Sequence, residues 1–105
     1  MDRVEKLKQF LAVNPGDSFV KHALALEYIK GGEDAVAQQL FEEILEKDPT
    51  YIGSYYHLAK LLERSGKREE AISWYKTGMQ RATEAGDRHA LNELRAAHDE
   101  LADEY

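Results

Sequence analysis

The four histidines are the residues of this chain that are best suited to metal binding or acid–base chemistry. His22, His57, His89 and His98 are scattered along the sequence, and no two of them stand four residues apart. A zinc site on one helix needs such a pair, or thiolate ligands, and the chain contains no cysteine. We therefore expect ordinary histidines and no metal, with His22 alone kept as a candidate binding contact.

The acidic residues and glycines form no catalytic pattern. Neighbouring acids such as Glu42 and Glu43 diverge by about 100° around a helix, so they do not converge in a cleft. The glycine motifs of phosphate-binding loops and of hydrolase nucleophile turns do not occur in the sequence. Without cysteine there is neither a disulfide nor a cysteine nucleophile. The sequence predicts neither an enzyme nor a cofactor-binding protein.

Charge is distributed unevenly along the 105 residues, whose net charge is −6. Residues 51–83 carry six Lys or Arg and three acids, whereas residues 84–105 carry two Arg and seven acids. The simpler interpretation is solvation of helix faces, and the alternative is that the basic segment meets an acidic partner. Nucleic acid is not an expected partner, because phosphate binding needs a clustered basic surface.

No membrane segment or signal peptide is expected. No apolar run approaches the roughly 20 residues that a transmembrane helix needs. The first ten residues, MDRVEKLKQF, carry charges where a signal peptide needs an apolar run. These features predict a cytoplasmic protein.

The spacing of apolar residues predicts helices along nearly the whole chain. Apolar residues recur every three or four positions, and no segment alternates with a period of two. Breaks that contain Pro or Gly, at 14–16, 31–32, 48–49, 66 and 85–87, separate six expected helices. The fourth helix is expected over about 52–65 and the fifth over about 68–83.

The same landmarks return after 34 residues in the middle of the chain. The recurring pairs are Pro15 and Pro49, Leu24 and Leu58, Ala25 and Ala59, Gly32 and Gly66, Ala37 and Ala71, and Phe41 and Tyr75. A period of this length indicates stacked copies of one supersecondary unit. Small residues let two helices approach closely, so Ala25 is expected to face Ala37 and Ala59 to face Ala71.

This pattern resembles the tetratricopeptide repeat. Residues 18–51 match it through Leu24, Ala25, Tyr28, Gly32, Ala37, Phe41 and Pro49, and residues 52–85 match it through Tyr55, Leu58, Ala59, Gly66, Ala71 and Tyr75. Residues 1–17 look like the second helix of an incomplete unit, with Leu7, Phe10, Leu11 and Pro15 in step with Phe41, Ile44, Leu45 and Pro49. Residues 86–105 look like the terminal solvating helix of the family.

The resemblance implies an all-α, right-handed superhelical array of antiparallel helix pairs, forming a single domain over 1–105. Two departures from the family pattern are informative. Gly78 stands where Ala is usual, which favours close helix packing. Thr83 stands where a closing proline is usual, so the fifth helix is expected to run on toward Gly86.

The resemblance also implies an adaptor without catalytic activity that binds a protein or peptide in a concave groove. The groove positions map to Phe19, His22, Leu26 and Ile29 in one unit and to Gly53, Tyr56, Lys60, Glu63 and Arg64 in the next, and of the second set Tyr56, Lys60 and Arg64 are the candidate binding residues. Clamping of acidic chaperone tails is not expected, because His22, Leu26 and His57 occupy places that need Lys or Asn. The alternative is a structural protein that self-associates weakly through an end face or Trp74.

Overall fold

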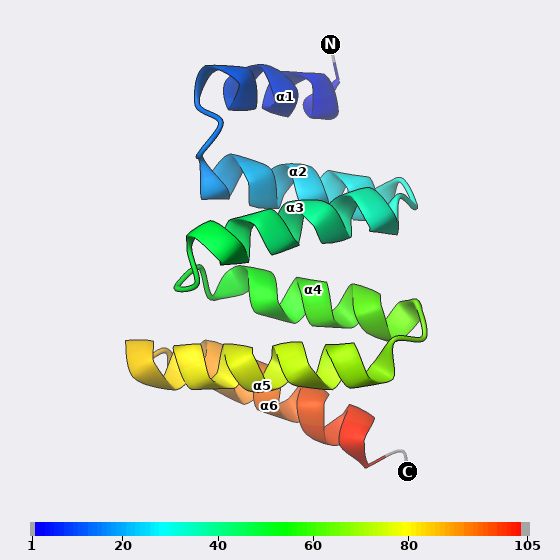
Figure 1. The fold of residues 1–105 in the computed structure, drawn as a ribbon, viewed down its shortest axis with the longest axis vertical. Coiled ribbons are helices and arrows are strands. Elements are labelled where there is room, and N and C mark those ends of the chain that lie inside the picture. Colours follow the sequence, from blue (N-terminus) through cyan, green and yellow to red (C-terminus); the bar gives the residue numbers. More distant parts are fainter. Residues whose placement is uncertain (1, 104–105) are drawn as a thin grey trace. The chain divides into compact units, whose positions relative to one another are not determined.

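Six helices make up the part of the chain that the structure, a computed structural model, describes, residues 2–103 (Figure 1). They are α1 (Arg3–Val13), α2 (Ser18–Lys30), α3 (Asp34–Lys47), α4 (Gly53–Arg64), α5 (Arg68–Ala85) and α6 (Arg88–Ala102). No strand occurs between residues 2 and 103, and the predicted all-α class is confirmed. Met1, Glu104 and Tyr105, which the predicted segments include, lie outside the described residues.

The helix ends follow from local chemistry. The side chains of Asp2, Asp17 and Asp87 each accept a hydrogen bond from the backbone N–H three residues later, at 2.8, 3.0 and 3.0 Å. Such N-caps satisfy amide groups that have no partner within the helix. Gly86 after α5 has a φ of 71°, a left-handed conformation that favours glycine. The fifth helix runs on to Ala85, as expected from the missing proline at Thr83.

The chain divides into two compact units, Met1–Asp48 and Pro49–Tyr105, which we call the first and second units. In the first unit α2 contacts both α1 and α3. Leu7, Ala23 and Leu24 form a buried cluster, against which the partly buried residues Val4, Leu11, Val20, Tyr28 and Leu40 pack. Ala25, Ala37 and Phe41 have no exposed surface, so the repeat positions of this unit are core positions.

In the second unit α4 contacts both α5 and α6. Its buried residues include Leu58, Ala59, Ala71 and Tyr75, which are positions that repeat along the sequence, and Tyr55, which matches the family pattern. Gly78 of α5 lies where a Cβ atom would stand 2.7 Å from the Cβ of Tyr55 and 3.1 Å from the Cδ1 of Leu94. Glycine therefore lets α4, α5 and α6 approach one another, as its departure from the family pattern predicted.

Across residues 2–103, none of the helices combines the length and the apolar character needed to cross a membrane.

Candidate functional site

One side of α2 carries the four candidate binding residues of the first unit. Phe19, His22, Leu26 and Ile29 follow one another at spacings of three or four residues, so they share a side of the helix. Phe19 is 72% exposed, whereas the other three side chains are partly buried. An aromatic ring held in water on a well-capped helix is a feature that the core does not explain.

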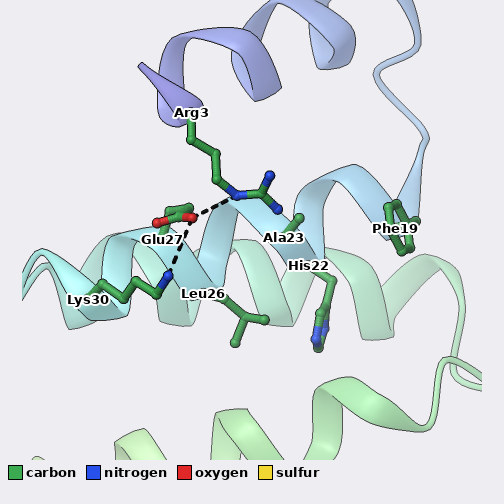
Figure 2. A pocket seen from close by; sticks show the side chains of 7 residues that line it. All are labelled: Arg3, Phe19, His22, Ala23, Leu26, Glu27 and Lys30. Atoms are coloured by element: carbon green, nitrogen blue, oxygen red, sulfur yellow. Dashed lines mark ion pairs between the residues drawn. The ribbon is translucent and has the colours of Figure 1, made fainter.

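Three of these residues line an open hollow of about 440 Å³ in the first unit. Phe19, His22 and Leu26 are joined there by Ala23, Glu27 and Lys30 of α2 and by Arg3 of α1. Figure 2 shows Phe19 near the start of α2 and Lys30 toward its other end, with Arg3 reaching across from α1. Ile29 is not among the residues that line the hollow.

Charge gathers at the end of the hollow that lies away from Phe19 (Figure 2). The Nε of Arg3 lies 2.7 Å from Oε1 of Glu27, and the Nζ of Lys30 lies 3.7 Å from the same oxygen. The side chains of Arg3 and Lys30 are 65% and 76% exposed, whereas that of Glu27 is 16% exposed. Two cations share one carboxylate, so this end of the hollow keeps a net positive charge.

Sequence reasoning missed Arg3, Glu27 and Lys30. The spacing of Glu27 and Lys30 by three residues was a usable signal for an ion pair within the helix. Arg3 gave no such signal, because it reaches Glu27 only once α1 packs against α2.

His22 also contacts the core of the first unit. Its ring centroid lies 5.5 Å from that of Phe41, with an angle of 66° between the ring planes, and Phe41 has no exposed surface. This edge-on arrangement of rings is a favourable one. His22 is therefore held at the edge of the hollow by a buried aromatic residue.

Tyr56, Lys60 and Arg64, the selected residues of the second unit, follow one another every four residues along α4. The Nζ of Lys60 lies 5.7 Å from the centroid of the Tyr56 ring and 3.7 Å from Oε2 of Glu63. Tyr56 and Lys60 are partly buried, and Arg64 is exposed. Lys60 is thus oriented by a ring and a carboxylate on its own helix.

Glu63 connects this surface to the core of the second unit. The hydroxyl of Tyr75 donates a hydrogen bond to Oε2 of Glu63, the oxygen that also faces Lys60. Burial and this hydrogen bond raise the pKa of Tyr75. The Tyr56 ring lies 6.5 Å from the ring of the buried Tyr75, so Tyr75 contacts both residues that orient Lys60, Tyr56 and Glu63.

No group of three or more His, Asp or Glu residues able to hold a metal ion occurs among residues 2–103. Trp74, the residue considered for self-association, is partly buried, and its ring centroid lies 6.0 Å from that of Tyr55. It therefore covers a core residue of α4.

A model of the tetratricopeptide repeat family matches residues 32–97. The chain is 41% identical to a tetratricopeptide repeat domain protein of Salinibacter ruber, whose crystal structure aligns with a TM-score of 0.80 over 83% of this chain and 97% of that one. A protein of Bordetella parapertussis is 26% identical and aligns with a TM-score of 0.85 over 99% of this chain and 90% of that one.

A curated relative is interferon-induced protein with tetratricopeptide repeats 3 of Mus musculus. The identity is 30% over 69 residues, which are 66% of this chain and 17% of the mouse protein. The match thus spans less than a fifth of that relative.

Proposed function

The chain belongs to the tetratricopeptide repeat family, and we propose that it is an adaptor that docks a peptide or helix of a partner protein on the exposed sides of α2 and α4. Repeats of this family generally form non-catalytic modules that bind other proteins. In our proposal Phe19, His22, Leu26, Ile29 and Tyr56 cover apolar side chains of the partner, and Lys60 and Arg64 meet its acidic groups. A cytoplasmic location is part of the same proposal.

The exposure of Phe19 beside an open hollow is the observation that carries this proposal. Aromatic residues are enriched in protein interfaces because they offer a large and fairly rigid contact area. Phe19 contributes little to the core at 72% exposure, and Ala23 and Leu26 extend its apolar surface along the hollow.

Preorganisation supports the same proposal for α4. Lys60 is already oriented by Tyr56 and Glu63, and Glu63 is in turn bound by Tyr75. Side chains that are ordered before binding lose less conformational freedom when a partner arrives, so less of the interaction energy is spent on ordering them.

Capture of proteins from native lysate tests the proposal. The intact chain is compared with a Tyr56→Ala, Lys60→Glu double variant and with Phe19→Ser, and Val36→Ser is the control because Val36 is an exposed apolar residue of α3. We expect a specific partner that the control retains and that both groove variants lose. A folded double variant and a folded Phe19→Ser that both keep full affinity for the partner would refute the proposal.

Self-association is the second candidate function. Trp74 covers Tyr55, so the exposed apolar residues of α1 support this alternative better: Phe10 is 63% exposed and Val13 is 87% exposed. Sedimentation velocity over a concentration series separates the two functions. A monomer at all concentrations argues against self-association, and a stable dimer that occludes the hollow argues against partner docking.

A further inference from the structure

Phe10, Ile44 and Gly78 occupy the same place in α1, α3 and α5, because they are spaced 34 residues apart. Ile44 of α3 is 1% exposed and Gly78 of α5 is buried, whereas Phe10 of α1 is 63% exposed. This position of the repeat is therefore buried in α3 and α5 and exposed to solvent in α1.

The second unit shows what kind of element covers this position. A Cβ atom at Gly78 would meet Tyr55 of α4 at 2.7 Å and Leu94 of α6 at 3.1 Å. The position thus lies against a helix, α4, which contacts both α5 and α6. Leu94, which is 1% exposed, completes the contact from the helix that follows.

The first unit contains the counterparts of Gly78 and Leu94. Phe10 precedes Gly78 by 68 residues, and Leu26 precedes Leu94 by the same 68, which is twice the repeat length. Leu26 lines the hollow between α1 and α2. Phe10 lies two helical turns from Arg3, which also lines the hollow, so Phe10 and Arg3 share one side of α1, although Phe10 is not itself among the lining residues. Residues 2–48 include no helix in the place that α4 takes in the second unit.

We propose that this open place, formed by Arg3, Phe10, Phe19, Leu26 and Lys30, binds an acidic amphipathic helix of a partner protein. This inference rests on the proposed function and names the class of partner. The bound helix packs on α1 as α4 packs on α5, and it turns its apolar side toward Phe10, Phe19 and Leu26.

Charge and size define the partner helix further. Arg3 and Lys30 share the single carboxylate of Glu27 and stay largely exposed, so acidic residues at that end of the helix complement them. In the second unit a large residue, Tyr55, meets a residue without a side chain, Gly78. Phe10 is large, so close approach calls for Ala or Gly in the partner helix opposite it.

Three synthetic peptides of about 16 residues test this inference, since helices of this length can form in water when their sequence favours them. The first is an Ala-rich helix with a Leu stripe and a Glu-rich flank. The second has the same composition in scrambled order, and the third has Lys in place of Glu. Each is labelled with fluorescein and titrated with the chain, and anisotropy reports the Kd.

We expect the first peptide to bind about tenfold more tightly than the other two. Phe10→Ser should weaken its binding about tenfold and Val36→Ser should leave it unchanged. Lys30→Glu should weaken binding of the Glu-containing peptide and strengthen binding of the Lys-containing peptide. Circular dichroism checks that each variant folds. Equal binding of the first and scrambled peptides, or full binding by both Phe10→Ser and Lys30→Glu, would overturn the inference.

If something other than a partner helix occupies this place, the experiments give different results. A dimer that Phe10→Ser dissociates in sedimentation would assign the place to a second copy of this chain and overturn the inference. If the Glu peptide fails to bind while the partner captured from lysate still requires Phe19 and Tyr56, the helix proposal falls and the adaptor function stands. If the Glu peptide does not bind and capture from lysate does not depend on Phe19 and Tyr56 either, the adaptor function is wrong as well.

Discussion

Gly78 packs directly against Tyr55: a Cβ atom at position 78 would stand 2.7 Å from the Tyr55 Cβ, closer than real Cβ contacts come. Gly78→Ala should therefore destabilise the protein even though alanine favours helices. Overpacking costs about 1–3 kcal/mol, and helix propensity offsets about 1 kcal/mol of that. We expect a net loss of up to about 2 kcal/mol in the free energy of unfolding, measured by urea denaturation.

Gly53 provides the matched control, because it is exposed in the first turn of α4. Gly53→Ala should leave stability unchanged or raise it by up to about 1 kcal/mol. Equal effects of the two substitutions would contradict the close approach of α4 and α5 at Gly78.

Enlarging a repeated alanine should also be costly. Ala37 has no exposed surface, so Ala37→Leu should lower the free energy of unfolding by about 1–3 kcal/mol through overpacking. Ala35 lies on the same helix and is exposed, so Ala35→Leu is the control and should change stability little. If Ala37→Leu is as stable as the control, the repeated alanines are not packing positions.

Arg68 holds the end of the last helix. Its Nη2 donates to the carbonyl oxygens of Leu101 at 3.2 Å and Ala102 at 3.4 Å, in the last turn of α6, where the carbonyl groups of a helix run out of donor partners within the helix. A cation in this place typically contributes about 0.3–1 kcal/mol. Arg68→Gln should speed amide hydrogen exchange in the last turn of α6, and Arg95→Gln, at an exposed position of α6, should not. Unchanged exchange in Arg68→Gln would contradict this role.

Stability should fall on mild acidification because of His57. Burial lowers the pKa of His57, and the nearby charge of Glu93 only partly opposes this. The unfolded chain, in which a histidine titrates near about pH 6.5, then binds the proton more readily than the folded one. This contribution to stability is present above about pH 6.5 and is lost as the pH falls below it.

Urea denaturation at several pH values checks this prediction. The loss of stability between pH 7.5 and 5.5 should be smaller in His57→Gln than in the unsubstituted chain. An identical loss in both proteins would show that His57 is not responsible.

The sequence was sufficient to predict the helices and the burial of the repeat positions. Apolar spacing, Pro and Gly breaks and capping acids are local signals, so the ends of α4 and the extension of α5 to Ala85 could be predicted. The burial of Tyr75 and the alanines followed from the 34-residue repeat, because equivalent places pack alike, and that of Tyr55 followed from its place in the family pattern.

The hollow could be predicted only in part. Phe19, His22 and Leu26 came from the position of α2 in the repeat, whereas Arg3 joins them through a contact between two helices. The repeat put Phe10 in step with the buried Ile44 but could not report its exposure. Exposure depends on whether a neighbouring helix is present, and helical periodicity does not contain that information.

Amide chemical-shift mapping tests the adaptor account most directly. Spectra of the isotope-labelled chain are recorded while the partner recovered from lysate is added. The account predicts that the largest shift changes fall on α2 at Phe19, His22 and Leu26 and on α4 at Tyr56 and Lys60. Changes confined to α3 and α5, with α2 and α4 unaffected, would contradict it.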